Sequence, residues 1–436
     1  MSSNFQTILV SIFLAFFVFA VLIFSGYIKL GGSSTSSVLK GRIVIWGVFP
    51  SSDLLTTFAP ISKINKDLKI NYVQKNIFSY QQDLIEAFAN GKGPDLFIIT
   101  PDMIQENSNF ISRIPYASYP EKIFKDSFIN GADIYLDNEG TIGFPLVVDP
   151  MVLYYNKDIL SNEGIVYPPK TWDELFVLNP TLTKRDNIGV ISQSMIALGQ
   201  YDNVNNVKDI LATLLIQNGN PIVSRDSSGG YFSLLNNKTI GSSATTIDEV
   251  IAFFLEFSNI SNSSYSWNRS LSNSLDMFTS SKLVFYIGKT SELFKIQSMN
   301  PNLSFDVTSI PQIKDSATKL TYGDIYAVVV NKKSNNLVLA NQVSAMLVTG
   351  DVANNFSTAV SLPPASRALL SVKPSNPYLF SFFNSALISR SWLDPNKAKS
   401  NLIFRELIEN ILSNSTSTRE AINKAQGQLQ LLLNKK

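Results

Sequence analysis

Residues 140–160 read GTIGFPLVVDPMVLYYNKDIL, and this stretch decides how the chain folds. Apolar residues run from position 142 to position 155, as in a strand that is buried on both faces. Asp149 and Pro150 interrupt the run at its centre. A carboxylate is costly to bury, and proline lacks the amide hydrogen that a central strand donates. The rest of the chain has to explain why a buried run carries these two residues.

The composition excludes several classes of function. The 436 residues are enough for two or three lobes, and 45% hydrophobic residues provide for apolar cores. A formal net charge of +2 without a basic block gives no indication of nucleic-acid binding. The chain has no cysteine and no histidine, which excludes disulfides, thiolate metal sites and a histidine-based catalytic triad. Carboxylate chemistry is still possible, so an enzyme is disfavoured, and no cofactor or metal is implied.

The N-terminal segment is long and apolar. The first 28 residues carry no charged side chain, and residues 8–24 (ILVSIFLAFFVFAVLIF) are apolar apart from Ser11. With residues 25–28 the segment reaches about 20 residues, which at about 1.5 Å each cross a hydrocarbon core of about 30 Å. We therefore predict a transmembrane anchor in residues 1–28 and a flexible linker in residues 29–41, which contain GGSSTSS. The alternative is a cleaved signal peptide, although no basic residue precedes the apolar run and no A-x-A site follows it.

Strands and helices alternate along the rest of the chain, which indicates an α/β fold class. The order strand, helix, strand over residues 43–99, with short connections, predicts a parallel βαβ unit. Short apolar runs predict strands at residues 43–45, 96–99, 282–287 and 325–330. Capping-box patterns predict helix starts at residues 79–82, 171–174, 246–249 and 417–420. A helix is also expected at residues 337–348.

Several stretches resemble a known family when they are taken in order. YQQDLIEAFANGKGPDLFII (residues 80–99) is similar to a helix–turn–strand segment of the extracellular solute-binding proteins of bacterial ABC importers, in the cluster that includes maltose-binding proteins. GFPLVVDPMVLYYNKDIL (143–160), followed by GIVYPPKTWDEL (164–175), resembles the most diagnostic part of that family. The resemblance covers nearly all of residues 42–433.

The resemblance implies a periplasmic-binding-protein-like fold, in which two α/β lobes are joined by crossing strands and close on a ligand by a hinge movement. One lobe is expected to comprise residues 42–148 and 324–355, and the other residues 149–323 and 356–436. Val148 and Pro150 are the expected hinge residues of the first crossover. Gly323 is the expected hinge residue of the second, where it supplies backbone freedom. Asp149 then faces the ligand cavity and not the core of a sheet.

The resemblance also implies ligand contacts. Maltose-binding members carry acids at the places of Asp149 and Asp102, so both are candidate ligand-binding residues. The alternatives are a helix or turn cap for Asp149 and an N-cap for Asp102. Trp46 directly follows a predicted strand and is either an aromatic platform for a sugar or a core residue. Tyr286 and Ser291 flank an expected cleft loop and are the candidates from the second lobe.

The function implied by the resemblance is that of a membrane-tethered, extracellular solute-binding protein. It is expected to capture a small solute, with a sugar or oligosaccharide favoured, and to deliver it to ABC permease subunits. Ile99 stands where maltose-binding members carry a sugar-stacking tryptophan, so maltodextrins are not specifically indicated. Lys29, Lys40 and Arg42 follow the apolar span and by the positive-inside rule favour the opposite orientation, but the secreted fold outweighs these dispersed charges.

Two other function classes stay open. A surface carbohydrate hydrolase needs two carboxylates roughly 5–9.5 Å apart across one glycosidic bond, and the sequence shows no such pair. A sensory or adhesive ectodomain on the same scaffold has no distinguishing feature in the sequence.

Overall fold

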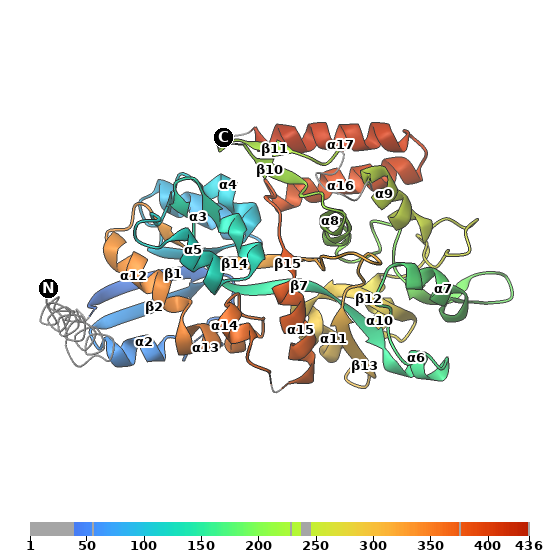
Figure 1. Cartoon of the computed structure of the whole chain (residues 1–436), viewed down its shortest axis with the longest axis horizontal. Coiled ribbons are helices and arrows are strands. Elements are labelled where there is room, and N and C mark those ends of the chain that lie inside the picture. Colours follow the sequence, from blue (N-terminus) through green and yellow to red (C-terminus); the bar gives the residue numbers. More distant parts are fainter. Residues whose placement is uncertain (1–38, 55, 227–228, 237–245, 375, 435–436) are drawn as a thin grey trace, which may run out of the picture.

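A computed structural model describes residues 39–434 except residues 55, 227–228, 237–245 and 375. The predicted transmembrane anchor and most of the predicted linker, residues 1–38, lie outside the described residues. Among the described helices, none is long and apolar enough to cross a membrane. Two lobes lie side by side along the long axis of the molecule (Figure 1).

The first lobe is built on a mixed sheet. The predicted parallel pairing of the strands at residues 43–45 and 96–99 is confirmed, but a helix and a strand that were not predicted, at residues 59–64 and 68–74, lie between the first strand and the predicted helix. The strand β1 (Gly41–Gly47) pairs in parallel with β3 (Leu96–Ile99) and, on its other side, with β2 (Leu68–Gln74). The helix α3 (Tyr80–Ala89) buries Leu84 and Phe88 against this sheet. The remaining elements of this part of the chain are α2 (Ala59–Ile64), η1 (Pro101–Met103), α4 (Ile104–Asn107), β4 (Ile111–Ser112), α5 (Glu121–Ser127), η2 (Asn130–Tyr135), β5 (Leu136–Asp137) and β6 (Gly140–Thr141).

The second lobe has its own strands and a layer of helices. The strand β12 (Leu283–Lys289) lies between β9 (Ile191–Ile196) and β7 (Phe144–Asn156), and β13 (Phe305–Ser309) pairs with β7. Its other elements are α6 (Lys157–Asn162), α7 (Asp173–Leu182), β8 (Lys184–Arg185), α8 (Val207–Gln217), β10 (Val223–Arg225), β11 (Tyr231–Ser233), α9 (Ile247–Glu256), α10 (Ser274–Thr279), η3 (Thr290–Glu292) and α11 (Leu293–Met299).

The C-terminal part of the chain contributes to both lobes (Figure 1). Buried apolar side chains form two clusters, one for each lobe. Leu362 and Leu370 belong to the first cluster, whereas Phe404 and Leu429 belong to the second. The lobe boundaries expected from the sequence stay a prediction. The elements concerned are β14 (Thr321–Asn331), α12 (Leu337–Leu347), α13 (Gly350–Val360), α14 (Arg367–Leu370), α15 (Pro377–Leu387), β15 (Ser389–Arg390), α16 (Lys397–Leu412) and α17 (Thr418–Leu433).

The strand β7 is continuous through Asp149 and Pro150 but changes its partners there. Its residues up to Pro150 pair with β14, and its residues from Met151 onward pair with β12 and β13. Pro150 lies opposite Gly323 of β14, and Met151 lies opposite Lys289 of β12. The acid and the proline therefore lie where one lobe's strand pairing gives way to the other's.

The helix starts follow the capping predictions in part. At Thr246 both hydrogen bonds of a capping box form with Glu249, as predicted. At Ser417 the hydroxyl accepts a hydrogen bond from the amide of Glu420. The capping box predicted at Ser79 is wrong, because its side chain makes no cap hydrogen bond.

Gly323 is needed for a close approach and not for backbone freedom. Its φ angle is not in the left-handed region. A Cβ atom at this position would lie 2.9 Å from Ser389 Oγ and 3.2 Å from Pro150 Cα. Ser389 Oγ cannot move away freely, because it donates a hydrogen bond of 2.8 Å to the carbonyl of Ser385.

We expect Gly323→Ala to lower the free energy of unfolding by about 1–3 kcal/mol, because the added methyl group overpacks the crossover. The matched control is Gly427→Ala in α17, where a Cβ atom would meet nothing within 4 Å. This control should raise the free energy of unfolding by roughly 0.5–1 kcal/mol, since alanine replaces glycine inside a helix. Urea denaturation of both variants measures the two effects. A stability unchanged by Gly323→Ala would contradict the close approach.

Candidate functional site

A cleft of about 960 Å³ lies between the two lobes. On the first lobe it is lined by the end of β3, by the segments that follow β1, β2 and β3, and by the start of α3, as expected for a ligand site at the carboxyl ends of parallel strands. On the second lobe it is lined by the loop before α8, the start of α8 and the end of β12. The start of α16 also lines the cleft, and Tyr326 of β14 lines it between the lobes.

The first-lobe wall combines aromatic and polar groups. Phe78, in the loop between β2 and α3, is 97% exposed at the cleft. Its backbone amide is held by a 2.9 Å hydrogen bond to Asn76 Oδ1. Gln81 Oε1 accepts a hydrogen bond of 2.9 Å from Asn107 Nδ2, whereas Gln81 Nε2 is buried with no hydrogen-bond partner among the described residues.

The second-lobe wall presents the start of α8. Asn206 has a left-handed φ of 60° directly before the helix, and its amide nitrogen donates a 2.8 Å hydrogen bond to Glu292 Oε1. Tyr201 and Asp202 lie in the loop before it and also line the cleft. Arg405 of α16 holds Asp202 with two hydrogen bonds of 2.7 and 2.9 Å.

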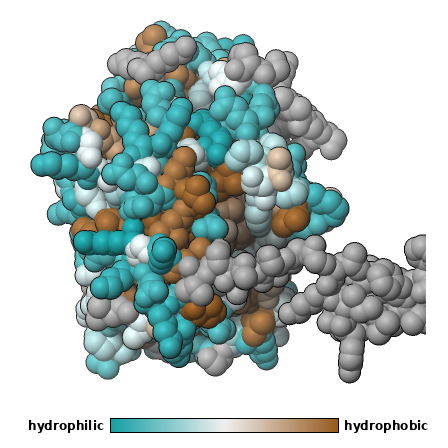
Figure 2. Space-filling model, turned by 90° about the vertical axis from the view of Figure 1, so that its left-hand side faces the viewer, coloured by the Kyte–Doolittle hydropathy of each residue, from teal (hydrophilic) through white to brown (hydrophobic). Residues whose placement is uncertain are grey.

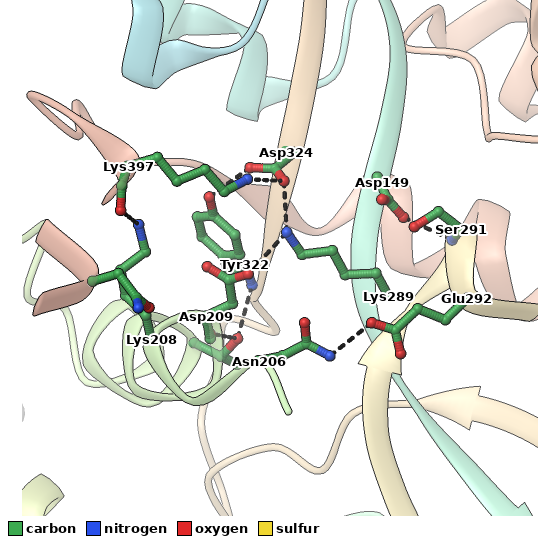
Figure 3. Close-up of polar contacts among 12 residues, drawn as sticks. Asp149, Asn206, Lys208, Asp209, Lys289, Ser291, Glu292, Tyr322, Asp324 and Lys397 are labelled. Atoms are coloured by element: carbon green, nitrogen blue, oxygen red, sulfur yellow. Dashed lines mark hydrogen bonds and ion pairs between the residues drawn. The ribbon is translucent and has the colours of Figure 1, made fainter. Parts of the chain in front are cut away.

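A network of charged side chains, all buried except Lys397, lies at the floor of the cleft (Figure 3). Lys289 Nζ lies 2.8 Å from Asp209 Oδ2 and 2.6 Å from Asp324 Oδ2. Lys397 Nζ lies 3.1 Å from the same oxygen of Asp324, and the hydroxyl of Tyr322 donates a 2.7 Å hydrogen bond to Asp324 Oδ1. These residues come from β12, α8, β14 and α16, so the network joins four elements at one point.

A second buried pair lies beside this network. Lys208 Nζ, at the start of α8, lies 2.6 Å from Asp394 Oδ2 and donates a 3.0 Å hydrogen bond to Ser400 Oγ. These contacts join the start of α8 to the start of α16. They fix the positions of the two helix starts that line the cleft.

Pairing outweighs burial for the charges at the floor. Burial alone would raise the pKa of Asp324, but Lys289 and Lys397 lower this pKa below its usual value. Burial likewise acts to lower the pKa of Lys289, yet Asp209, Asp324 and Asp149 raise it well above its usual value. The pKa of Lys397 is raised, chiefly by Asp324. Asp324, Lys289 and Lys397 are therefore charged at neutral pH.

Comparison with known families identifies this architecture. The profile of the bacterial extracellular solute-binding protein family matches residues 56–349, which is more than half of the chain. The chain belongs to this family. The prediction of a binding protein that acts outside the cell, and not of an enzyme, is confirmed by this membership. The part of this solute-binding protein that the structure describes has no group of acidic side chains that could hold a metal ion.

Individual relatives are distant in sequence. A galactooligosaccharide-binding protein of Bacillus subtilis (strain 168) is 23% identical over 150 residues. That match spans 34% of each chain, or about a third of the relative's length. Three solved structures share the two-lobed fold. A cyclo/maltodextrin-binding protein complexed with maltotetraose has a TM-score of 0.71 and 14% identity, covering 93% of this chain and 99% of the other.

The other two structures have the same fold. A sugar-binding protein from Xanthomonas citri has a TM-score of 0.71 and 16% identity, covering 91% of this chain and 98% of its own. An ABC substrate-binding protein from Listeria monocytogenes, in complex with cycloalternan, has a TM-score of 0.65 and 17% identity, covering 91% of this chain and 100% of its own. The periplasmic-binding-protein-like fold predicted from the sequence is confirmed.

Only some of the predicted ligand contacts line the cleft. Asp102 lines the cleft, and burial raises its pKa while Lys397 offsets part of this effect. Trp46, Tyr286 and Ser291 are not among the residues that line the cleft. Their role as ligand contacts stays a prediction that the cleft geometry does not support.

Trp46 and Tyr286 have partners inside their own lobes. The ammonium group of Lys75 lies 3.7 Å from the ring centre of Trp46. Tyr286 is buried in the core of the second lobe, where its ring stacks on Phe278 at 5.6 Å. Its hydroxyl donates a 2.6 Å hydrogen bond to Glu292. Tyr286 therefore has the contacts of a core residue, and Trp46 those of a partly buried one.

Asp149 has the contacts of a cap, which is the alternative that the sequence left open. Its Oδ1 accepts hydrogen bonds from Thr290 Oγ1 at 2.8 Å and from the amide of Ser291 at 2.9 Å (Figure 3). The side chain thus holds the start of η3. Burial raises the pKa of Asp149, while Lys289 and the hydrogen bonds from Ser291 offset part of this rise. Asp149 is not among the residues that line the cleft.

Sequence reasoning missed several cleft residues. Ile77 and Phe78 precede α3 between polar residues, and an apolar pair at that place could have indicated an exposed loop contact. Lys289 and Lys397 are 108 positions apart, and no local pattern indicates that both reach Asp324.

We expect Asp149→Ala to lower the free energy of unfolding by about 1–3 kcal/mol, because the Thr290 hydroxyl and the Ser291 amide lose their acceptor inside the protein. Asp149→Asn keeps an oxygen that can accept both hydrogen bonds and should cost less. Urea denaturation measures both variants, and calorimetry should show ligand affinity nearly unchanged. A tenfold loss of affinity at unchanged stability would instead make Asp149 a ligand contact.

We expect Asp324→Asn to lower the free energy of unfolding by about 3 kcal/mol, because the buried ammonium group of Lys289 and the half-exposed one of Lys397 lose a charged partner. The control is Asp351→Asn, an exposed acid in the first turn of α13, which should change stability by less than about 0.5 kcal/mol.

The same pair of proteins tests the pH dependence. The pKa of Asp324 is lowered by folding, so its stabilising effect is present above the unfolded pKa of about 4 and is lost as the pH falls through the lower folded value. The stability difference between wild type and Asp324→Asn should therefore shrink below about pH 4. A difference that stays constant down to about pH 2 would contradict the paired state of Asp324.

Proposed function

We propose that this solute-binding protein captures a sugar or oligosaccharide in the cleft and delivers it to the permease subunits of an ABC importer. The observation that carries the proposal is the make-up of the two cleft walls. An exposed aromatic ring, Phe78, stands at the first wall, and Tyr201 and Tyr326 add aromatic surface from the second lobe and from between the lobes. Sugar rings place their apolar faces on aromatic side chains and their hydroxyls on planar polar groups.

Each lobe contributes to the cleft lining one residue with a buried polar atom that has no partner among the described residues. Gln81 Nε2 on the first lobe and Asp209 Oδ1 on the second are buried, line the cleft, and have no hydrogen-bond partner among the described residues. Buried polar atoms normally have a partner, so a donor and an acceptor left over on opposite walls fit a ligand rich in hydroxyls. A volume of about 960 Å³ is large enough for an oligosaccharide.

The distant relatives support the same class of ligand. These relatives include a galactooligosaccharide-binding protein and binding proteins in complex with maltotetraose and with cycloalternan. Their identities to this chain are low, so the choice among sugars has to come from its own cleft.

Closure of the lobes is part of the proposal. Asn396 Nδ2 donates a 2.9 Å hydrogen bond to Glu106 Oε1 across the cleft. Arg225 also donates a 2.7 Å hydrogen bond to the carbonyl of Leu136, which joins the second lobe to the first. We propose that these contacts form and break as the lobes move about the crossover that contains Val148, Pro150 and Gly323. The lobe boundaries at residues 148/149 and 323/324 belong to this proposal.

The tether belongs to the proposal as well. Residues 8–24 are apolar, and the chain has no cysteine to carry a lipid. We propose that residues 1–28 anchor the protein in the cell membrane as a single-pass segment, with the lobes on the extracellular side. Delivery to a permease then takes place along the membrane and not from free solution.

We expect Phe78→Ala to weaken binding of a cognate oligosaccharide by about tenfold or more, because the sugar loses an aromatic face worth roughly 1.5 kcal/mol. Isothermal titration calorimetry with maltotriose and with galactooligosaccharides measures the affinity. The matched control is Phe294→Ala on α11, which removes an exposed phenylalanine outside the cleft and should leave affinity unchanged.

Two results would contradict this proposal. Equal affinities for wild type and Phe78→Ala would show that the ring does not contact the sugar. Binding of peptides but of no sugar would overturn the ligand class while leaving the binding fold intact.

A further inference from the structure

The outer edge of the first lobe carries basic side chains that have no acidic partner. All of them are exposed, and none forms an ion pair within the part of the chain that the structure describes. We name this group the basic edge, and it consists of Lys40, Arg42, Lys66, Lys69, Lys332 and Lys333.

The sheet brings these residues together from three stretches of sequence. Arg42 of β1 lies opposite Lys69 of β2 in the parallel register, and the amide of Gly41 donates a 3.0 Å hydrogen bond to the carbonyl of Asp67. The turn that follows β14 is joined to the same place, because Asn336 Nδ2 donates to the carbonyl of Arg42 at 3.4 Å. Parallel strands start at one edge of a sheet, and β14 runs antiparallel to β3 and ends there.

The basic edge is remote from the cleft. The cleft is lined at the carboxyl ends of β1 and β3, whereas the basic edge lies at their amino ends. Apolar side chains are exposed among the basic ones: Ile64 is 73% exposed and Val338 is 75% exposed. Figure 2 looks onto this end of the molecule and shows hydrophobic residues surrounded by hydrophilic ones.

The chain enters the structure at this edge. The amide of Leu39, the first described residue, donates a 2.9 Å hydrogen bond to Asn65 Oδ1 beside the start of β2. Residues 25–38 separate it from the apolar run of residues 8–24. Fourteen residues span at most about 50 Å, so a membrane that holds the apolar run also holds the basic edge within that distance.

We propose that the basic edge binds the anionic headgroups of the membrane in which the N-terminal segment is anchored. Each lysine or arginine close to an anionic surface strengthens binding about fivefold, and the attraction falls off within a Debye length of about 8–10 Å. Exposed apolar side chains between the basic ones add contacts at the headgroup boundary. The inference rests on the anchor proposed above only in that the anchor keeps the basic edge near the membrane. The charges of the basic edge and their arrangement come from the described residues.

This binding would orient the protein. With the basic edge on the membrane, the carboxyl ends of β1 and β3 point away from it, so the cleft opens toward the solution that supplies the solute. Docking on a permease then requires release of the edge, and salt should favour that release.

Fluorescence quenching at the bilayer surface tests the proposal. The chain has no cysteine, so a fluorophore on Asn335→Cys, in the exposed turn after β14, labels the basic edge alone. The full-length protein is reconstituted into vesicles that carry a headgroup-linked quencher. We expect strong quenching in vesicles with phosphatidylglycerol at low salt, and weak quenching in pure phosphatidylcholine or at high salt. A label on Asn187→Cys, exposed on the second lobe, should stay unquenched.

A pair of triple variants separates the basic edge from overall charge. Lys66→Gln, Lys69→Gln and Lys332→Gln together should weaken the surface association about a hundredfold, from about fivefold for each residue. The matched control replaces Lys295, Lys314 and Lys319, which are exposed on the second lobe and form no ion pair with a described residue, by glutamine. This control should leave the quenching unchanged.

Equal quenching in neutral and anionic vesicles, or equal loss in both triple variants, would overturn the proposal. Flotation with neutral vesicles at high salt tests the anchor separately. If the protein does not float with neutral vesicles, the proposed anchor is wrong, but flotation with anionic vesicles at low salt still tests the basic edge. Failure to float with anionic vesicles would overturn the basic-edge proposal as well. Sugar calorimetry is independent of both measurements, so failure of the proposed ligand class is recognised separately.

Discussion

The carboxylate of Asp324 is the point at which the parts of this protein meet. It lies on β14 and contacts the ammonium groups of Lys289 and Lys397 at 2.6 and 3.1 Å. Asp149 of β7 is its direct partner in the strand register, so the two crossing strands bring two acids to one place. Cations must be supplied there, because two buried carboxylates side by side repel each other. The end of β12 and the starts of α8 and α16 converge on this point, and each of these segments also lines the cleft.

The same place explains how one sheet serves two lobes. The strand β7 is continuous, but its hydrogen bonds pass from β14 to β12 and β13 after Pro150. Proline, which has no amide hydrogen, is tolerated at position 150 because the hydrogen-bond ladder of β7 is interrupted there by the change of partner strand. The lobes are therefore joined by an ordered pair of antiparallel strands and not by a flexible linker. Closure of such lobes has to bend this pair, and the close contact at Gly323 limits where it can bend.

The direction of the parallel strands gives the first lobe two ends of different composition. The segments after the carboxyl ends of β1, β2 and β3 carry the aromatic and polar groups of the cleft wall. Their amino ends carry unpaired basic side chains and the place where the chain enters. A parallel sheet keeps these ends apart, because a strand cannot change direction within the layer. The ligand capture and the membrane attachment proposed for these two ends can therefore vary independently in sequence.

The sequence by itself determined the fold class, the family and the buried strands, because these depend on local apolar runs and on the order of short motifs. The strands at residues 43–45, 96–99 and 325–330 are examples, and each lies inside a strand of the structure. The place of Asp102 beside the cleft also followed from the motif order.

Only the tertiary structure decided which side chains share a space. Asp149 and Tyr286 carry residue types suited to a sugar, yet one caps η3 and the other packs in a core. Phe78, which no pattern singled out, stands exposed at the cleft. The physical reason is that periodicity reports whether a residue is buried along its own strand or helix. Which strand ends face one another is set by pairings between residues more than a hundred positions apart, such as Asp149 with Asp324.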